Sequence, residues 1–313
     1  MTLEILRAGP FTTVQDLGRP GWGWIGVPRG GAADAPSLRL ANRLVGNREG
    51  AAGLEVTLAG PQISFAADAW VALAGSRFVA SVGHDPVPHA TALRIRAGQT
   101  LSIGRTAEGA RAVLAVRGGV EVPPVLGSRS TFVAGGFGGV DGRPLRRGDH
   151  LSIGAIDANA RARAAREDLL PAYEAEGAWR VILGPQSDAF GDAARETLLG
   201  ATYRVSTLAD RTGLRLEGPR IVHSGGADLL PEGIAHGGIQ VPADGQPIVL
   251  GCDHPTTGGY AKIATVIAAD LWRIGQAKPG DRVRFVAVDV SEAHALYRRQ
   301  EELHRSAVEG SSG

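Results

Sequence analysis

The feature that most constrains the fold of this chain is the regular interruption of short apolar runs by glycine and proline. Its 313 residues include 45 Gly and 18 Pro, which are spread along the chain rather than gathered in one segment. They separate runs such as VALAG, AVLAV and PIVLG, in which small and β-branched residues dominate. Such runs are typical of short strands joined by tight turns, because glycine and proline end regular structure. The sequence therefore predicts a mainly β fold with a few short helices.

Composition excludes several classes of protein. Hydrophobic residues make up 43% and aromatic residues only 5%, so the core must consist mainly of aliphatic side chains. A formal net charge of +1 gives no long-range field that would attract nucleic acid or an anionic membrane. The start of the chain has no basic segment followed by an apolar run, and no stretch approaches the roughly 18 apolar residues of a membrane span. We expect a cytoplasmic protein with neither nucleic acid nor membrane as a partner.

The only cysteine, Cys252, leaves no possibility of a disulfide or a Cys-ligated zinc site within one chain. Its apolar surroundings in PIVLGC predict a small buried side chain. The sequence predicts no metal site.

The first predicted domain, residues 1–156, is rich in strands. A short strand at Leu3–Leu6 precedes a helix that Asp34 should cap and Gly46 should end. Further strands are predicted at GLEVTLAG, ISFAA, WVALAG, LRIRAGQTLSIG, RAVLAVRGG and LRRGDHLSIG.

The remainder of the chain has three predicted parts. Residues 157–176 are rich in Ala, Arg and Glu and predict a helical linker. The second domain, 177–290, begins with the strand WRVILG, contains a helix at 187–200 and closes with the strand DRVRF. Residues 291–313 form a predicted amphipathic tail whose final EGSSG should be disordered.

The two predicted domains share sequence features in the same order. GLEVTLAGPQI from Gly53 resembles GLRLEGPRI from Gly213, and AGQTLSIG from Ala97 resembles PGDRVRF from Pro279. A degenerate internal duplication explains this order. Chance similarity between the turns of two β-rich domains is the alternative.

A lysine marks the first candidate site. Only two of the 33 basic residues are lysines, and Lys262 stands where the polar segment TTGGY meets the apolar run IATVIAA. An ammonium is a compact charge that suits binding a carboxylate or activating a carbonyl group. The alternative is an edge charge that guards a strand end.

The residues before Lys262 are the predicted ligand-binding loop. Thr256 and Thr257 offer hydroxyl groups, Gly258 and Gly259 allow close approach of the backbone, and Tyr260 adds a ring with a polar tip. We expect this loop to hold a small polar or anionic group.

His254 and Asp253 complete the predicted catalytic set with Lys262. His254 is a candidate general acid or base, and Asp253 would orient it or accept a hydrogen bond from a substrate amide. A structural role is the alternative for each of them.

Other segments carry weaker signals. Arg29 and the glycines after it precede a helix N-terminus, which suits an anion, although Asp34 can use the same donors as a cap. Gln240, with His236 on the same predicted loop, offers an amide that could recognise a lactam or urea through hydrogen bonds. GSRSTFVAGGFGG is a wide hairpin, or alternatively a lid or partner surface, and LADRTGLRLEGP predicts an ion-paired turn.

Known nucleotide and nucleophile motifs are absent: the chain has no GxxxxGK[ST], GxSxG or HExxH, and no GxGxxG between a strand and a helix. The ordered segments TTVQDLGRPGWG, GVPRGGAADAPSLRLANRLVGN, GLEVTLAGP, LAVRGG, LGSRSTF, GGFGG, GIQVPADGQPI, TTGGYAKIATVIAADL and PGDRVRF instead resemble one family. It is the family of the 5-oxoprolinase C subunit, also called KipA or allophanate hydrolase subunit 2. It is similar to part of the urea amidolyase carboxyltransferase domain. The resemblance covers about residues 3 to 287.

The resemblance implies two cyclophilin-like β-barrels. It further implies a KipI-like B subunit and an A subunit as partners, and ATP with Mg at the level of the complex, with none demonstrable from this chain alone. Two positions depart from the family pattern. Gly30 stands where the family commonly has Ser, which weakens the Arg29 to Asp34 site, and Ala261 replaces a proline before Lys262.

Three functions remain open from the sequence. The first is a subunit of an ATP-dependent 5-oxoprolinase that opens 5-oxo-L-proline to L-glutamate. The second is a subunit of a biotin-dependent carboxyltransferase acting on urea or a similar amide, with the biotin supplied by another chain. The third is a non-catalytic regulatory protein that binds a KipI-like partner.

Overall fold

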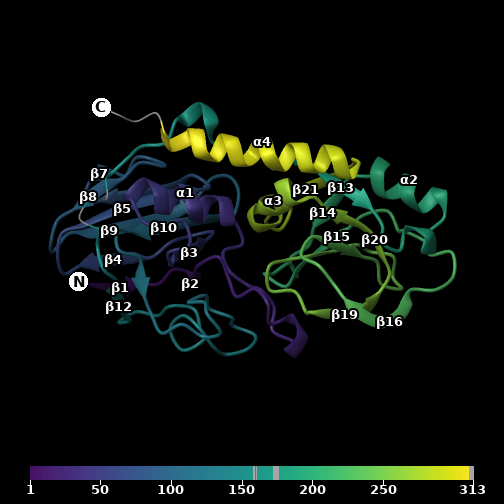
Figure 1. Cartoon of the computed structure of the whole chain (residues 1–313), viewed down its shortest axis with the longest axis horizontal. Coiled ribbons are helices and arrows are strands. Elements are labelled where there is room, and N and C mark those ends of the chain that lie inside the picture. Colours follow the sequence, from purple (N-terminus) through teal and green to yellow (C-terminus); the bar gives the residue numbers. More distant parts are fainter. Residues whose placement is uncertain (158, 160, 172–175, 310–313) are drawn as a thin grey trace. The chain divides into compact units, whose positions relative to one another are not determined.

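The chain forms two compact units in a computed structural model that describes residues 1–157, 159, 161–171 and 176–309 (Figure 1). The first unit contains Met1–Arg19, Gly30–Ala172 and Glu302–Gly313, and the second contains Pro20–Arg29 and Tyr173–Glu301. The units therefore overlap the predicted domains over most of their length. Residues 20–29 belong to the second unit, however, and the end of the predicted tail belongs to the first.

Two sheets build the first unit. The larger has the strand order β11-β12-β1-β4-β9-β6-β7, and the smaller has the order β2-β3-β10-β5-β8. The strands are β1 (Thr2–Arg7), β2 (Phe11–Gln15), β3 (Gly53–Thr57), β4 (Gln62–Phe65), β5 (Ala69–Gly75), β6 (Phe78–Val82), β7 (Asp85–Pro86), β8 (Leu93–Ile95), β9 (Thr100–Thr106), β10 (Arg111–Val116), β11 (Val120–Glu121) and β12 (His150–Ile153).

Alternating residues of these strands form the core of the first unit. Leu3 and Ile5 of β1 are fully buried, whereas Thr2 and Glu4 are exposed. Such alternation is expected because successive side chains of a strand point to opposite faces of the sheet. The predictions of strands in this half are confirmed.

Helix α1 (Ala35–Val45) covers part of this unit with an apolar face that contains Leu38, Ala41 and Leu44. Asp34 caps its first turn, and Gly46 ends it in the left-handed region at φ 79°. Both ends lie where the sequence predicts them. The cap stabilises the helix because its carboxylate accepts backbone N–H groups that have no partner inside the helix.

The second unit is a closed barrel with the strand order β13-β20-β17-β18-β15-β14-β21, accompanied by the two-stranded ribbon β16-β19. These strands are β13 (Glu176–Leu183), β14 (Tyr203–Val205), β15 (Gly213–Glu217), β16 (Asp228–Gly233), β17 (Gly238–Gln240), β18 (Ile248–Leu250), β19 (Thr257–Tyr260), β20 (Lys262–Val266) and β21 (Arg282–Ala287). The prediction of a mainly β fold with few short helices is confirmed.

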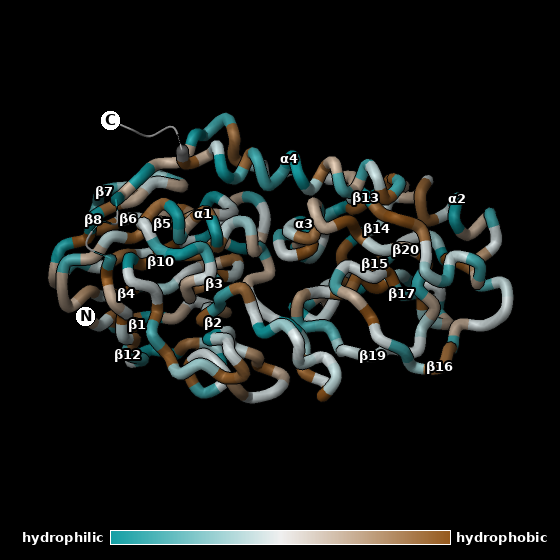
Figure 2. Tube along the Cα trace, viewed as in Figure 1, coloured by the Kyte–Doolittle hydropathy of each residue, from teal (hydrophilic) through white to brown (hydrophobic). Residues whose placement is uncertain are grey.

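Aromatic side chains fill part of the barrel of the second unit. Phe285 lies 6.2 Å from Trp179 and 6.1 Å from Tyr203, measured between ring centroids. The remaining short helices are η1 (Gly23–Ile25), η2 (Glu167–Leu169), η3 (Ser187–Ala189), α2 (Asp192–Gly200), η4 (Ala268–Asp270) and α3 (Leu271–Gln276). Apolar stretches follow the barrel strands in Figure 2.

The prediction of a helical linker at 157–176 is wrong for the described residues, in which η2 is the only helical turn. Backbone groups of this segment are bonded to other parts of the first unit instead. Arg163 N–H donates to Leu44, Ala165 N–H donates to Ala90, and Arg166 N–H donates to Ala307. These tertiary hydrogen bonds outweigh the intrinsic helix propensity of an Ala- and Arg-rich segment, because tertiary context routinely overrides propensity. Residues 158, 160 and 172–175 lie outside the described part.

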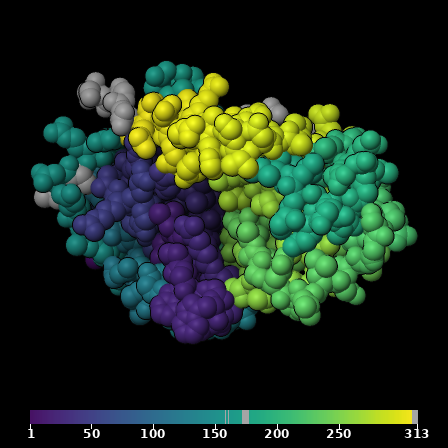
Figure 3. Space-filling model, turned by 45° about the vertical axis from the view of Figure 1, so that its right-hand side comes forward, coloured from purple at the N-terminus to yellow at the C-terminus, as the bar shows by residue number. Residues whose placement is uncertain are grey.

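The predicted amphipathic tail is helix α4 (Val290–Glu309), which is largely hydrophilic in Figure 2 and lies at the surface in Figure 3. Its first turns contribute Ala293 to a small apolar cluster of the second unit, and its last turns contribute Ala307 and Val308 to the first unit. The predicted disorder of EGSSG concerns residues 309–313, of which Glu309 is the last residue of α4 and 310–313 lie outside the described residues. Within the described residues, no helix combines the length and apolarity needed to cross a membrane.

Candidate functional site

The TTGGY segment is a strand and not the predicted loop. Residues Thr257–Tyr260 form β19, which pairs with β16 in the ribbon of the second unit. The register places Glu232 opposite Gly258 and Asp228 opposite Tyr260. Pairing with β16 satisfies backbone groups that a loop would leave to solvent, and this partner lies too far away in the sequence for local patterns to indicate it.

Lys262 is the first residue of β20 and is only 4% exposed. Strand β20 lies between β13 and β17 in the barrel, so Lys262 does not guard a sheet edge, as the structural alternative supposed. Its Nζ lies 2.7 Å from Oε1 of Glu232 and 3.5 Å from the carbonyl oxygen of Tyr260. A buried ammonium needs such partners because its desolvation is costly.

Glu232 and Gln186 complete the surroundings of this lysine. Gln186 Nε2 donates to Oε1 of Glu232 at 2.5 Å, and Gln186 Oε1 accepts from the backbone N–H of Lys262 at 3.1 Å. The hydrogen bond from Lys262, followed by the one from Gln186, lowers the pKa of Glu232 and keeps this carboxyl group ionised. Sequence reasoning found neither Glu232 nor Gln186.

Gln240 ends strand β17, where a loop was expected, and it pairs in register with Lys262. Its side chain is 6% exposed, and Nε2 has no acceptor among the residues that the structure describes. A Cβ atom added to Gly258 would lie 2.6 Å from this nitrogen. Glycine at 258 therefore lets the ribbon strand β19 lie directly against the amide of Gln240.

We call Lys262, Glu232, Gln186, Gln240 and Gly258 the Lys262 cluster. The ammonium has three N–H donors, of which Glu232 and the Tyr260 carbonyl occupy two. The third donor and Nε2 of Gln240 are each able to donate a hydrogen bond to a further acceptor. A buried amide donor without an acceptor is costly unless a ligand accepts its hydrogen bond. This arrangement therefore favours a small polar ligand.

A pair of histidines forms a second group in the same unit. The rings of His236 and His254 are stacked, with centroids 6.3 Å apart and planes 26° from parallel. Nδ1 of His254 lies 2.6 Å from the carbonyl oxygen of Pro255, which places the proton on Nδ1 and leaves Nε2 as the acceptor in the neutral ring.

Burial lowers the pKa of both histidines. The pKa of His236 falls to about 4, because of burial first, then of the charge that His254 carries when it is protonated, and then of the positive charges of Arg29 and Arg211. Burial also lowers the pKa of His254, while the Pro255 hydrogen bond and the Asp253 charge oppose the shift. Both rings are therefore neutral at pH 7, and His254 retains a basic nitrogen.

Asp253 is paired with Arg211 rather than with His254. Its Oδ2 accepts from Nε of Arg211 at 2.7 Å, and its Oδ1 accepts from Nη2 at 3.1 Å. The sequence placed Arg211 in an ion-paired turn, but its partner lies 42 positions further along the chain. This bidentate pair fixes the start of the segment that carries His254. An orienting role of Asp253 toward His254 stays a prediction.

Other predicted residues have partners or positions of their own. Asp34 is a helix cap in the first unit, where its Oδ1 accepts from the backbone N–H of Ser37 and its Oδ2 accepts from the Ser37 hydroxyl. Arg29 belongs to the second unit and is exposed. The backbone oxygen of Thr256 accepts a hydrogen bond from the N–H of Ile234. Cys252 is buried, as predicted.

Among the residues that the structure describes, no group of three or more His, Cys, Asp or Glu side chains is placed to hold a metal ion.

Comparison with known proteins adds a family. A family model described as "Carboxyltransferase domain, subdomain A and B" matches residues 25–287. The chain is 39% identical over 300 residues to the C subunit of 5-oxoprolinase from Escherichia coli (strain K12), and the match covers 96% of this chain and 95% of that protein. It is also 35% identical over 329 residues to urea amidolyase of Lachancea kluyveri, covering 98% of this chain but only 18% of that protein.

A solved structure shows the same fold. The crystal structure of Kluyveromyces lactis urea carboxylase matches 99% of this chain with a TM-score of 0.94 and 34% sequence identity. The match occupies 29% of that longer chain.

Proposed function

Because this chain belongs to the carboxyltransferase-domain family of subdomains A and B, we propose that it is the C-type subunit of an ATP-dependent 5-oxoprolinase. In this proposal the whole complex opens 5-oxo-L-proline to L-glutamate. It breaks the ring C–N bond, adds the elements of water and hydrolyses ATP to ADP and phosphate. The other parts of the enzyme are a KipI-like B subunit and an A subunit, and ATP with Mg enters at the level of the complex.

The observation that carries the proposal is the identity of 39% with a 5-oxoprolinase C subunit over nearly the whole of both chains. A second 5-oxoprolinase C subunit, from Haemophilus influenzae (strain ATCC 51907 / DSM 11121 / KW20 / Rd), is 33% identical over 95% of its length. The match therefore extends over the whole fold rather than over one motif.

The Lys262 cluster suits the chemistry of a lactam. Attack on an amide carbonyl builds negative charge on its oxygen, and fixed donors around that oxygen lower the barrier. The free donor of the Lys262 ammonium and Nε2 of Gln240 are two such donors, both from buried side chains. In our proposal they bind the carbonyl oxygen, while Gly258 admits the ring against the ribbon.

Glu232 sets the charge of this site. Its carboxylate is half exposed and holds the ammonium at 2.7 Å, so the charge of the ammonium is balanced before a substrate binds. As negative charge develops on the substrate oxygen, the ammonium interacts with both groups. Lys262 gains its catalytic advantage only from the second interaction, because the first is present before reaction.

His254 is the proposed general base or acid. Its neutral ring offers Nε2, since Nδ1 is occupied by the Pro255 carbonyl. Asp253 assists indirectly in this proposal, because its pairing with Arg211 fixes the backbone that precedes His254.

The test combines purified chain with its B and A partners and follows glutamate release from 5-oxo-L-proline with ATP. Lys262→Met should lower kcat/KM by roughly 100-fold or more, as expected for loss of an oxyanion donor. Lys278→Met is a matched control, because Lys278 is the only other lysine and pairs with Asp281 at 3.4 Å outside the cluster. Full activity of Lys262→Met would refute the site.

A second candidate function is biotin-dependent carboxyl transfer to urea or a similar amide. The TM-score of 0.94 with a urea carboxylase favours it, because the whole chain has a counterpart there. Incorporation of labelled bicarbonate into urea, in the presence of ATP, a biotin carboxylase and a biotinylated carrier, would support this function. Glutamate release that continues when this chain is left out would favour a regulatory role instead.

A further inference from the structure

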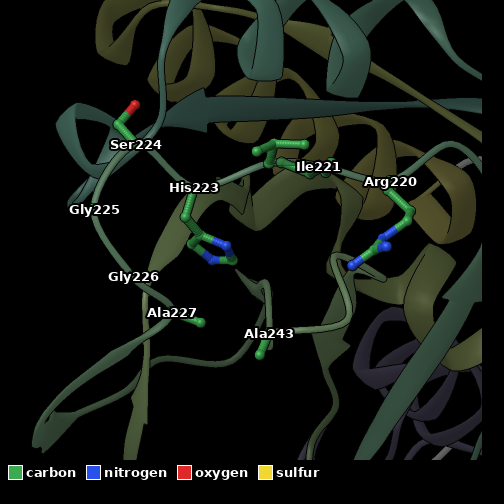
Figure 4. A pocket seen from close by; sticks show the side chains of 9 residues that line it. Arg220, Ile221, His223, Ser224, Gly225, Gly226, Ala227 and Ala243 are labelled. Carbon is green, nitrogen blue, oxygen red and sulfur yellow. The ribbon is translucent and has the colours of Figure 1, made fainter.

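A surface cavity of about 470 Å³ lies in the second unit, lined by residues 220–227 and Ala243 (Figure 4). It contains no residue of the Lys262 cluster or of the histidine pair. We propose that this cavity, the Arg220 pocket, binds a small carboxylic acid that carries an N–H or O–H donor beside its carboxylate.

Arg220 provides the charge of the pocket. Its Nε donates to the backbone oxygen of Asp244 at 2.9 Å, which fixes the direction of the guanidinium group. Its two terminal nitrogens have no acceptor among the described residues and point into the cavity in Figure 4. A guanidinium held through Nε presents the planar pair of donors that matches the two oxygens of a carboxylate.

His223 provides the acceptor. Its Nε2 lies 2.8 Å from the carbonyl oxygen of Val241, so Nε2 carries the proton and Nδ1 has the lone pair in the neutral ring. Its ring packs on Phe190 with centroids 4.8 Å apart, and in Figure 4 it faces the same space as Arg220. An N–H or O–H group of a ligand can donate to Nδ1. This is why the proposed ligand carries such a donor beside its carboxylate.

The glycine pair beside His223 adds backbone donors. The N–H groups of Gly225 and Gly226 have no acceptor among the described residues. Gly226 has a φ of 140°, which side-chain-bearing residues rarely adopt, and this conformation turns the chain around the cavity. Successive backbone N–H groups of this kind form concave sites for anions.

The charge and lining of the pocket favour a monocarboxylate over phosphate. Arg220 is the only charged side chain among the lining residues, so a single negative charge is balanced. Ala227 and Ala243 offer an apolar wall for a hydrocarbon skeleton. The volume lies within the range of roughly 300 to 1,000 Å³ of small-molecule pockets.

The pocket shares strand backbone with the Lys262 cluster. His223 Nε2 bonds the carbonyl of Val241, Val241 N–H donates to Ala261, and Ala261 N–H donates to Ala227 in the pocket wall. Val241 and Ala261 directly follow and precede Gln240 and Lys262 in the sequence, respectively. A ligand in the pocket is therefore placed to influence the cluster without entering it.

The probe is 5-oxo-L-proline, because its ring N–H lies next to the carbon that bears the carboxylate. This choice of probe rests on the proposed function, whereas the ligand class rests on the pocket. Cyclopentanecarboxylate lacks the N–H, and 2-pyrrolidinone lacks the carboxylate. Binding of each compound to the complete chain, without partners, would be measured by NMR titration of the Gly225 and Gly226 amides.

We expect 5-oxo-L-proline to shift both glycine amides saturably, cyclopentanecarboxylate to bind several-fold more weakly, and 2-pyrrolidinone not to shift them. Arg220→Gln should weaken binding by roughly tenfold or more, as loss of a charge-assisted pair predicts. His223→Phe keeps the ring packing and should weaken 5-oxo-L-proline but not cyclopentanecarboxylate. Arg204→Gln, which removes an exposed arginine paired with Glu217 in the same unit, should change nothing.

Three outcomes would overturn the proposal: unchanged binding to Arg220→Gln, equal shifts with 2-pyrrolidinone, or tighter binding of inorganic phosphate than of the carboxylates. Lys262→Met separates the two sites. It should bind 5-oxo-L-proline at the glycine pair as the unaltered chain does, even though its kcat/KM in the complex should be lower by roughly 100-fold or more. Failure of the Arg220 pocket to bind the probe thus leaves the proposed function untouched, and the reverse also holds.

Discussion

At the scale of single residues, the second unit contains ionisable groups that are removed from water, and the cost of their desolvation is offset in two ways. Lys262 is compensated by Glu232, and Asp253 is compensated by Arg211. His236 differs from these two residues, because its charged form is avoided rather than paired. Burial, and after it the positive charges of its neighbours, lower its pKa and hold it in the neutral state, which carries no desolvation penalty for a charge.

The first prediction concerns the titration of His236. Its pKa in the folded chain is about 4, below the ordinary 6.5, so the unfolded chain takes up the proton first as the pH falls. The free energy of unfolding should therefore decrease as the pH falls from about 6.5 to about 4, and His236 should add no further loss below that range. NMR titration of the His236 ring measures the pKa directly.

Arg29→Gln should raise the pKa of His236 by removing one positive neighbour. The pKa should stay below 6.5, because burial is the larger cause of the shift. A His236 ring that titrates near 6.5 in the unaltered chain would show that it is not buried as described. This measurement also tests whether Arg29 acts on the histidine pair, where the sequence predicted an anion site with Asp34.

The sequence pointed to Lys262 because it is one of only two lysines among many arginines, and such an exception needs an explanation. It reached Gln240 because its amide suits a lactam or urea. It could not reach Glu232 or Gln186, which precede Lys262 by 30 and 76 positions in separate elements. Only the pairing of β16 with β19 and the path of the chain after β13 bring them to the ammonium.

At the scale of elements, the sequence indicates structure best where the signal is local. The cap at Asp34, the stop at Gly46 and the alternating burial of β1 depend on neighbouring residues alone. All three element errors involve distant partners. Strand β19 needs β16, Gln240 of β17 pairs with Lys262 of β20, and the segment after residue 156 bonds to Leu44, Ala90 and Ala307. Element type is thus predictable to the extent that backbone partners lie nearby.

The second prediction uses the contact between ribbon and barrel. Gly258→Ala would place a methyl group against Nε2 of Gln240, only 2.6 Å away. Because that nitrogen ends a flexible side chain, it should move aside while the backbone stays in place. We expect the free energy of unfolding to change by less than about 1 kcal/mol, while kcat/KM of the complex falls roughly tenfold.

Gly233→Ala is the matched control for this ribbon. Gly233 lies on the neighbouring strand β16, and a Cβ atom there meets nothing within 4 Å. Both variants would be compared in glutamate release and in urea-induced unfolding. Equal loss of activity in the two variants would mean that the ribbon tolerates no substitution, and the role given to the Gln240 amide would then be wrong.

At the scale of the whole molecule, each unit is discontinuous in the sequence. Residues 20–29 belong to the second unit, although the segments on both sides of them belong to the first. Residues 302–313 belong to the first unit, although the segment before them belongs to the second. Domain boundaries drawn from composition assume continuous segments, which is why the predicted limits at 156 and 290 do not describe these two exchanges. Cutting the chain between the units would therefore remove core residues from one of them.

The third prediction follows from the last turn of α4. Val308 is 1% exposed and packs in the apolar cluster of the first unit that includes Leu38 and Leu44 of α1. The guanidinium of Arg43 also donates to the backbone oxygens of His304 and Arg305. Val308→Ala removes two buried methyl groups and should destabilise the first unit by about 2 kcal/mol through lost burial and the cavity left behind.

Hydrogen exchange read out by peptide resolves the two units in this experiment. Protection should fall in α1 and β10, which pack with Val308, and should be unchanged in β15 and β20 of the barrel. Val290→Ala, at the exposed first turn of the same helix, should change neither, because Val290 is already 54% exposed. If protection fell equally in both units, stability would be shared across the molecule, and the division into two separate cores would not hold.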